Sequence, residues 1–202
     1  TGYLTLQLQA DFVLASASPR RADLLRQIGC RFLVAPVNVD ESVLPGEPAV
    51  EYVQRIALQK ARAGWFASPL SNVPVLGADT AVVAGPDIFG KPADREQALS
   101  MLHRLSGTTH RVLSAVAMVA GERQLLRCAE TQVTFRPLSV AECERYWQTG
   151  EPADKAGGYA IQGLGGVFVT GIQGSYSSVV GLPLAETCQL LQAFDIAWWR
   201  DT

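Results

Sequence analysis

Two arginines and two serines stand close together in the segment Leu14-Ala-Ser-Ala-Ser-Pro-Arg-Arg21. Arg20 and Arg21 fall in the first turn of a predicted helix, where the helix dipole makes positive charge mildly unfavourable. An anion bound between the backbone N–H groups and the two guanidinium groups would remove that conflict. The hydroxyl groups of Ser16 and Ser18 would add donors. The pattern therefore favours an anion-binding turn, with a solvated arginine pair as the alternative.

A carboxylate, that of Asp79, lies within the mostly apolar run Val75-Leu-Gly-Ala-Asp-Thr-Ala-Val-Val83. An ionised carboxylate loses its hydration in such a run unless it is paired. We therefore expect a general base or a ligand of a hard divalent cation, and an Asp that caps a local turn is the alternative. A kink at Gly77 would present the side chain at a sheet edge. Asp79 and Thr80 reach one site only if the strand bends there.

Two lysines have positions that allow more than one interpretation. Lys60 falls within the apolar stripe of a helix predicted over residues 49–66. Its ammonium group therefore either extends along the apolar surface to water or points into a polar cleft. Lys91 lies in a predicted turn, and it gains interest only because it follows the Asp79 strand closely.

A glycine-rich segment runs through Asp154-Lys-Ala-Gly-Gly-Tyr-Ala-Ile-Gln-Gly-Leu-Gly-Gly166. Its glycines permit close approach of the backbone to a flat ligand. Gln162 offers both an amide donor and a carbonyl acceptor. The segment matches neither the dinucleotide-binding fingerprint nor the P-loop. A glycine-rich turn with a structural glutamine is the alternative.

Strand and helix patterns alternate along the chain, which favours an α/β fold with one twisted mixed sheet. Strands are predicted over residues 12–15, 73–84, 111–120, 124–135 and 167–170. Helices are predicted from Pro19 to Gly29, over residues 49–66 and 94–105, from Ser139 to Gly150, and from Pro183 onward. The two strands around Gly121 form a predicted antiparallel pair, and this middle hairpin is a candidate for a second lobe.

The composition argues against several classes of protein. The 202 residues have a formal net charge of −2, so no global basic field favours nucleic acid or an anionic membrane. Four cysteines without a CxxC pair, and only two histidines, argue against a zinc site and indicate thiols in a reducing cytoplasm. No apolar stretch approaches the roughly 18 residues of a transmembrane helix. Residues 1–11 are interpreted as an N-terminal extension without the pattern of a signal peptide.

Six short segments occur in the order of a known family. They are Leu14-Ala-Ser-Ala-Ser-Pro-Arg-Arg21, Gly77-Ala-Asp-Thr80, Gly90-Lys-Pro92, Asp154-Lys-Ala-Gly157, Ile161-Gln-Gly163 and Val180-Gly-Leu-Pro183. In these motifs the chain resembles the Maf family of nucleoside triphosphate pyrophosphatases. The resemblance implies a mixed sheet flanked by helices, in two lobes with a deep cleft, similar to the inosine triphosphate pyrophosphatases. It places one such domain over residues 12–196.

The resemblance also implies an activity, the hydrolysis of a nucleoside triphosphate to the monophosphate and pyrophosphate with a divalent metal such as Mg or Mn. Arg20, Thr80 and Gln162 match the selectivity positions of the branch that acts on dTTP and UTP. A sister branch that acts on 7-methyl-GTP has Trp, Gln and Glu there. Asp79 corresponds to the family's proton acceptor. The implied substrates are dTTP and UTP, with modified pyrimidine triphosphates as further candidates.

Several residues follow from this resemblance as candidates for binding the triphosphate. Four are expected to contact phosphate: Ser16, Arg21, Lys60 and Lys91. Glu41 is a candidate second carboxylate that holds the metal together with Asp79, or else a solvated loop residue. The amide of Gln162 can pair with N3–H and O4 of uracil.

Two other functions remain open at this point. A non-catalytic nucleotide-binding regulatory module would keep the cleft but would have no need of the base Asp79. A nucleic-acid-binding module would need a basic face, which the net charge of −2 does not suggest. The expected partner is therefore a nucleoside triphosphate, without nucleic acid or membrane, and a second copy of the chain is a candidate partner.

Overall fold

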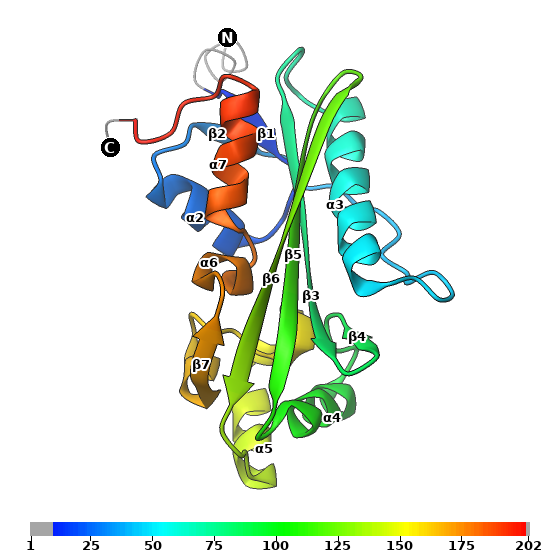
Figure 1. Ribbon diagram of the computed structural model, residues 1–202, viewed down its shortest axis with the longest axis vertical. Helices are drawn as coiled ribbons and strands as arrows, with labels where there is room; N and C mark the ends of the chain where they lie inside the picture. Colours follow the sequence, from blue (N-terminus) through cyan, green and yellow to red (C-terminus); the bar gives the residue numbers. More distant parts are fainter. Residues whose placement is uncertain (1–9, 201–202) are drawn as a thin grey trace. The chain divides into compact units, whose positions relative to one another are not determined.

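The computed structural model describes residues 10–200, and in this range a mixed sheet is flanked by helices (Figure 1). The strands are β1 (Phe12–Leu14), β2 (Phe32–Val34), β3 (Val75–Ala84), β4 (Asp87–Phe89), β5 (Thr109–Ala120), β6 (Arg123–Phe135) and β7 (Val169–Gln173). The helices are α2 (Pro19–Gln27), α3 (Ala49–Phe66), α4 (Arg95–Leu105), α5 (Val140–Gln148), α6 (Tyr176–Val180) and α7 (Leu184–Ala193). Short 3-10 helices are η1 (Glu151–Asp154), η2 (Ala156–Gly158) and η3 (Leu164–Phe168).

The strand order in the sheet is β2-β1-β3-β5-β6-β7, and β4 pairs with β3 outside this path. β1 runs parallel to β2, with Phe12 opposite Phe32, and parallel to β3, with Val13 opposite Val75. β3 and β4 are antiparallel, as are β6 and β7. Parallel and antiparallel pairs therefore share one sheet, and the predicted mixed α/β class is confirmed.

The described chain divides into two compact units. Unit 1 comprises the described residues up to Asp79, Ser114–Ala129, and the described residues from Gly181 onward. Unit 2 comprises Thr80–Leu113 and Glu130–Val180. The middle hairpin does not build a second lobe alone, because the halves of β5 and β6 next to their turn belong to unit 1. The other halves belong to unit 2, together with α4 and α5.

The core of unit 1 forms where helices pack on buried strands. Phe12, Val13 and Leu14 of β1 have no exposed surface, as expected of a short apolar strand. α3 lies along the β3 residues of this unit (Figure 1), and their contact is close because Gly77 has no side chain. A Cβ atom at Gly77 would lie 2.5 Å from the carbonyl oxygen of Ala57 in α3.

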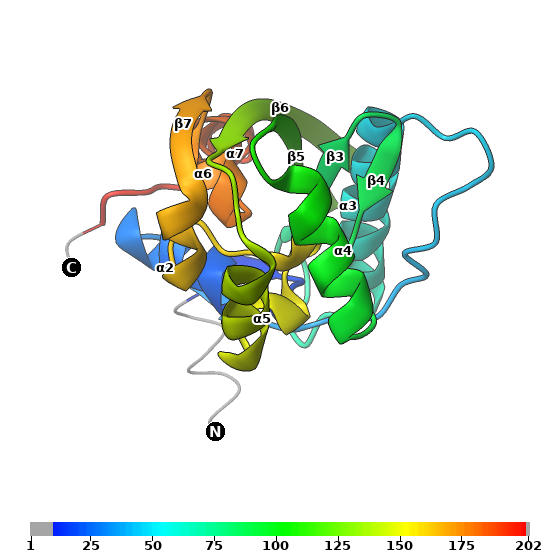
Figure 2. The same ribbon diagram turned by 90° about the horizontal axis from the view of Figure 1, so that it is seen from below.

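Unit 2 is built around α4, which packs against α5 and the short helix η2 (Figure 2). Asp94 caps α4 by accepting a hydrogen bond of 2.8 Å from the N–H of Gln97, as its sequence predicts. Ser139 caps α5 in the same way. Aromatic rings fill the interior, and the rings of Phe135 and Tyr159 meet edge to face with centroids 4.7 Å apart.

Some predicted boundaries differ from the structure. The strand predicted over residues 167–170 is β7 at Val169–Gln173, because residues 164–168 form the 3-10 helix η3. The three-residue strands β2 and β4 and the five-residue helix α6 were not predicted. The part of the N-terminal extension over residues 1–9 lies outside the described residues.

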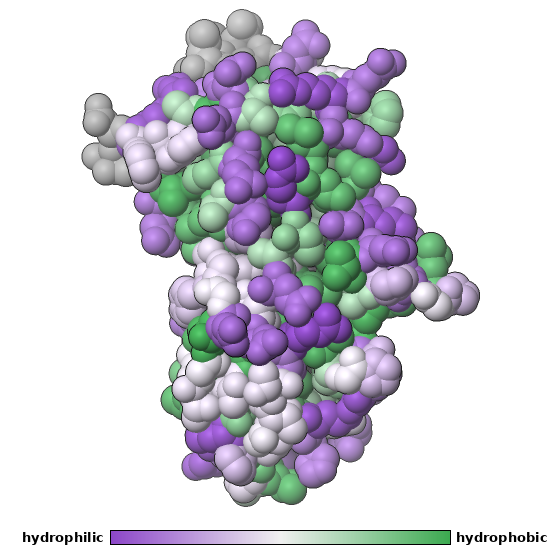
Figure 3. All heavy atoms as spheres, viewed as in Figure 1, coloured by the Kyte–Doolittle hydropathy of each residue, from purple (hydrophilic) through white to green (hydrophobic). Residues whose placement is uncertain are grey.

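The surface has the mixed character of a globular protein. On the face drawn in Figure 3, hydrophilic side chains are interspersed with hydrophobic ones. Within residues 10–200, no helix combines the length and the apolar character needed to cross a membrane. The same range holds all four cysteines, and they form no disulfide in it.

Candidate active site

Lys60 joins two carboxylates in unit 1. Its Nζ atom lies 3.0 Å from Oδ1 of Asp79 and 2.9 Å from Oε1 of Glu41. The side chains of Lys60 and Asp79 are 11% and 8% exposed, whereas that of Glu41 is 47% exposed. The structure thus brings three of the predicted residues into one ion-paired cluster. Lys60 points into a polar environment rather than out along the apolar surface.

The packing of α3 on β3 explains why this cluster forms. Residues two apart on a strand share a face, so Asp79 lies on the same face of β3 as Gly77. That face meets α3 where Ala57 and Ala61 approach Gly77, and Lys60 stands between these two alanines in the sequence. A glycine on the strand therefore lets the helix bring a lysine within reach of the aspartate.

The structure excludes one alternative for Asp79, that it caps a local turn. β3 runs from Val75 to Ala84, so Asp79 lies inside a strand. β1 pairs with β3 at Val75 and Leu76, and β4 pairs with it from Val82 to Ala84, so Asp79 lies beyond the end of β1. Neighbouring residues of a regular strand face opposite sides, so Thr80 reaches the site of Asp79 only where the strand bends.

Asp79 has the environment of a base. Burial raises the pKa of its carboxyl group above the ordinary value, and the charges of Lys60 and Arg21 only partly oppose this effect. Its second oxygen, Oδ2, is buried and finds no hydrogen-bond partner among residues 10–200. A buried acceptor without a partner is costly, and such an oxygen has the capacity to accept a proton or to bind a cation.

The loop that carries Glu41 is fastened to α3. The hydroxyl group of Tyr52 donates a hydrogen bond of 3.0 Å to the carbonyl oxygen of Glu41. Arg55 binds the Glu47 carboxylate through two hydrogen bonds of 2.6 and 2.8 Å, and donates another of 2.9 Å to the carbonyl oxygen of Ser42. The bond from Arg55 lowers the pKa of Glu47 to about 2. Sequence reasoning missed these anchors, because nothing local links α3 to a loop that precedes it.

Arg21 is buried, so the solvated-pair alternative does not hold for it. Its Nε atom donates to the carbonyl oxygen of Gly181 at 2.8 Å, and its Nη1 atom to Oγ of Ser16 at 3.2 Å. Burial lowers the pKa of its guanidinium group, and the charge of Asp79 acts in the opposite direction. Ser18 caps α2 at the N–H of Arg21, which confirms the predicted start of the helix. Ser16 and the carbonyl oxygen of Gly181 therefore fix the guanidinium group of Arg21, which lies in the first turn of α2.

The remaining candidates are more accessible to solvent. Arg20 is half-buried in the first turn of α2, in unit 1. Thr80 is half-buried in β3, whereas Lys91 and Gln162 are exposed, and these three belong to unit 2. Gln162 stands in the turn between Tyr159 and η3, and Lys91 in the segment between β4 and α4.

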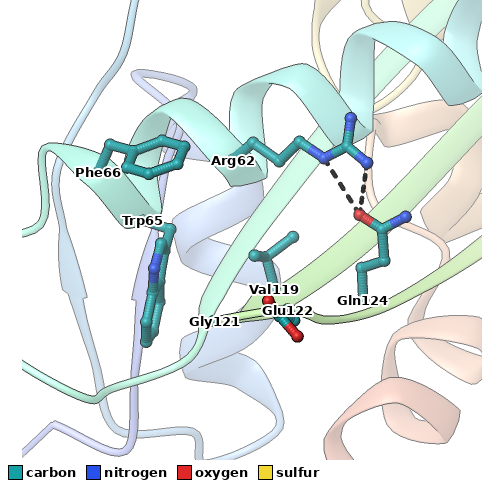
Figure 4. A pocket seen from close by; sticks show the side chains of 7 residues that line it. All are labelled: Arg62, Trp65, Phe66, Val119, Gly121, Glu122 and Gln124. Carbon is teal, nitrogen blue, oxygen red and sulfur yellow. Dashed lines mark hydrogen bonds between the residues drawn. The ribbon is translucent and has the colours of Figure 1, made fainter.

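A pocket of about 560 Å³ lies in unit 1 (Figure 4). It is formed at the end of α3 and the turn between β5 and β6, by Arg62, Trp65, Phe66, Val119, Glu122 and Gln124, with Gly121 at the turn. Arg62 donates hydrogen bonds of 3.1 and 2.6 Å to the Gln124 side chain. The pocket contains none of the residues expected to contact the triphosphate.

The match to known proteins covers nearly all of the described chain. A family model described as Maf-like protein matches residues 11–194. The chain belongs to the Maf family. The resemblance seen in its six motifs is thereby confirmed.

Curated relatives of this Maf protein match it over almost their whole length. A protein of Hahella chejuensis named dTTP/UTP pyrophosphatase is 54% identical over 190 residues, which cover 94% of both chains. A protein of the same name from Pseudoalteromonas atlantica is 54% identical over 92% of this chain and 97% of its own. A protein of the same name from Saccharophagus degradans is 52% identical over 95% of this chain and 92% of its own.

Among solved structures, the Ham1 protein of Staphylococcus aureus aligns with 61% of this Maf protein and 71% of its own chain. The sequence identity between the two proteins is 15%, and the TM-score is 0.44. The expected similarity to inosine triphosphate pyrophosphatases, and the deep cleft, stay predictions.

Proposed function

We propose that this Maf protein hydrolyses dTTP and UTP to the nucleoside monophosphate and pyrophosphate. The observation that carries the proposal is the buried Asp79, paired with Lys60 through one oxygen and without a partner at the other. Proteins named dTTP/UTP pyrophosphatase at 52–54% identity support it. Modified pyrimidine triphosphates are further candidate substrates.

In the proposed reaction a water molecule attacks the α-phosphorus atom. The bond between this phosphorus and the bridging oxygen breaks, and its electron pair leaves with pyrophosphate. Asp79 accepts the water proton at Oδ2, and its raised pKa makes it a stronger base than an exposed carboxylate. Lys60 holds Oδ1 and so fixes the direction of the carboxylate.

The phosphates need positive charge and hydrogen-bond donors, because negative charge shifts to the leaving group. We assign this role to Ser16, Arg21, Lys60 and Lys91. Arg21 donates to Ser16 and to the carbonyl oxygen of Gly181, so its guanidinium group is held in place before substrate binds. Arg20, Thr80 and Gln162 are proposed to select the nucleotide, with Gln162 pairing with uracil.

A divalent cation, Mg²⁺ or Mn²⁺, fits the carboxylates present. Asp79 and Glu41 are hard oxygen ligands held by the same lysine, and Oδ2 of Asp79 lacks a partner among the described residues. Residues 10–200 contain no cluster of three or more His, Cys, Asp and Glu side chains that would hold a metal alone. Mg²⁺ is commonly bound by one or two carboxylates together with substrate phosphates. When bound, the ion would offset phosphate charge.

The cellular setting follows from the sulfur chemistry. Four cysteines that form no disulfide in the described range suit a reducing compartment, so we propose the cytoplasm. We propose neither a nucleic acid nor a membrane as partner, and a homodimer is the candidate assembly. A single domain over residues 12–196 remains the proposed organisation.

Pyrophosphate release from dTTP, UTP, CTP, GTP and ATP, with Mg²⁺ or Mn²⁺, tests the function. We expect release that is fastest from dTTP and UTP. Asp79→Asn should fold but lose at least about a hundredfold in turnover, the usual effect of a positioned base. Asp87→Asn is the matched control, because Asp87 is exposed in β4 and pairs with Arg104.

Two results would contradict the proposal. Near-normal turnover of Asp79→Asn would remove Asp79 as the base. Tight binding of dTTP without pyrophosphate release from any nucleotide would indicate the non-catalytic regulatory module instead.

A further inference from the structure

The turn that carries Gln162 is held by a carboxylate from another segment of unit 2. Oε1 of Glu151 accepts a hydrogen bond of 2.9 Å from the N–H of Leu164. Its other oxygen, Oε2, accepts one of 2.9 Å from the N–H of Gly165 and one from the hydroxyl group of Tyr146. One side chain therefore fixes the backbone immediately after the turn.

Tyr146 holds the other end of the same turn. Its hydroxyl oxygen accepts a hydrogen bond of 3.1 Å from the N–H of Ala160, and its side chain is buried. The pair formed by Tyr146 and Glu151 thus binds the backbone both before and after residues 161–163. The exposed side chain of Gln162 extends from a backbone that is anchored on both sides.

Two glycines allow the backbone to reach these anchors. A Cβ atom at Gly163 would collide with the carboxylate of Glu151, and one at Gly165 would lie 2.6 Å from the hydroxyl oxygen of Tyr146. Gly163 and Gly165 therefore let the backbone approach Glu151 and Tyr146 closely. This explains part of the glycine-rich segment without reference to a ligand.

The Glu151 carboxylate is ionised at neutral pH. Its partial burial acts to raise the pKa, but the hydrogen bonds from Tyr146, Leu164 and Gly165 outweigh burial and lower the pKa from its ordinary value. Hydrogen bonds to an ionised acceptor are about twice as strong as neutral ones. The anchor is therefore stiffer than an ordinary turn.

We infer that Glu151 and Tyr146 are positioning residues for base selection. They hold the backbone of residues 160–165 so that the Gln162 side chain starts from a fixed position beside the base. A mobile turn would let the Gln162 amide move away from the edge of the base, which would weaken the hydrogen bonds that distinguish uracil from cytosine. The inference rests on the proposed function, in which Gln162 contacts the base.

The test compares Glu151→Gln with Glu144→Gln in the full chain. Glu144 is a suitable control because it is also a glutamate of this unit, pairs with Arg95 at 2.8 Å and lies on α5. Steady-state kinetics with UTP and CTP give kcat and KM for each variant. We expect Glu151→Gln to raise KM for UTP about tenfold, which is the effect of losing one charge-assisted hydrogen bond. The UTP preference, meaning the ratio of kcat/KM for UTP to kcat/KM for CTP, should fall by a similar factor. The value of kcat should change less than about threefold, because Asp79 is untouched.

Two further measurements separate positioning from a general loss of structure. In a Gln162→Ala background, Glu151→Gln should not lower the UTP preference any further, because the residue that it positions is gone. Hydrogen exchange at the amides of Leu164 and Gly165 should accelerate in Glu151→Gln and stay unchanged in Glu144→Gln. Tyr146→Phe, which keeps the carboxylate, is the milder variant if Glu151→Gln folds poorly, and it should lower the preference about twofold to fourfold.

The outcomes distinguish this inference from the function on which it rests. A wild-type enzyme that does not prefer dTTP and UTP removes the proposed function and the inference with it. If the wild type prefers dTTP and UTP but Glu151→Gln has the same preference and KM as Glu144→Gln, the inference is wrong and the proposed function stands. Additive effects of Glu151→Gln and Gln162→Ala would also overturn it.

Discussion

Asp79 shows how one residue can favour chemistry and disfavour stability. Because its folded-state pKa is raised, the folded protein binds a proton there more readily than the unfolded chain does. This proton binding stabilises the folded protein at pH values below the pKa that Asp79 has in the unfolded chain. The stabilisation is lost as the pH rises through the pKa that Asp79 has in the folded protein. In its ionised form the half-partnered carboxylate therefore destabilises the fold, and the unused oxygen is available to substrate.

The side chain of Gln162 supplies the prediction at this scale. Glu in its place keeps an acceptor for N3–H of uracil but removes the donor for O4 and adds negative charge. We expect Gln162→Glu to reduce kcat/KM for dTTP and UTP by about tenfold or more, and that for GTP and ATP by less. Competition between UTP and GTP measures the change.

The control for this variant is Gln173→Glu, because Gln173 is exposed on β7. An unchanged ranking of the substrates in Gln162→Glu would show that Gln162 does not read the base.

The charged residues of unit 1 were predictable for a physical reason. Asp79 and Lys60 stand at positions that the strand and helix periodicities assign to the interior, and a buried charge demands a partner. Their pairing was not predictable, because it depends on how close α3 approaches β3. The role of Glu151 was not predicted, because a glutamate just after a predicted helix is ordinary and only its contacts in the structure distinguish it.

At the scale of elements, the long regular patterns were reliable. The helix predicted over residues 49–66 is α3 at Ala49–Phe66, because its apolar stripe spans the whole element. β2 has three residues, too few to show a period, and it forms because β1 provides a parallel partner. The last strand was misplaced because glycines give no side-chain alternation to follow.

Arg55 provides the prediction for the loop anchored on α3. Removing its side chain breaks the two bonds to Glu47 and the bond to Ser42, so the loop that carries Glu41 loses its main anchor. Since Glu41 is a proposed metal ligand, Arg55→Ala should raise the Mg²⁺ concentration that gives half-maximal activity about threefold to tenfold. The activity at saturating Mg²⁺ should change less. A titration of activity with Mg²⁺ measures this.

Arg62→Ala is the matched control, because Arg62 lies on the same helix and binds Gln124. A Mg²⁺ requirement for Arg55→Ala equal to that of Arg62→Ala would contradict a link between the anchor and the metal.

At the scale of the whole molecule, buried polar groups set the response to acid. His110 lies in the core of unit 2, where its Nε2 atom is 2.7 Å from the hydroxyl oxygen of Tyr159. Its Nδ1 atom has no hydrogen-bond partner within the described residues. Burial lowers the pKa of His110 from 6.5 to about 4, so its ring stays neutral in the folded state while an unfolded chain would protonate it.

His110 should therefore weaken the fold in mild acid. The free energy of unfolding is expected to fall as the pH drops from 6.5 towards 4, by up to about 3 kcal/mol at about 1.4 kcal/mol per pKa unit. His110→Gln should flatten this dependence, because glutamine does not titrate. Urea unfolding between pH 7 and pH 4 measures it.

His103→Gln is the control, since His103 is exposed in the last turn of α4. If His110→Gln and the wild type lose stability in parallel over this range, other groups cause the acid sensitivity.

The contact between Gly77 and α3 has a consequence for genetics. Every missense allele of codon 77 adds a Cβ atom, and any such atom would meet the backbone of Ala57 and Ala61 at 2.5 Å. Backbone cannot move aside as a flexible side chain does, so the helix itself must shift, and it carries Lys60 with it. Codon 77 should therefore lack neutral missense alleles in a mutational scan. At codon 85 a Cβ atom meets no other atom within 4 Å, so only the positive φ of Gly85 should restrict the substitutions that are tolerated there.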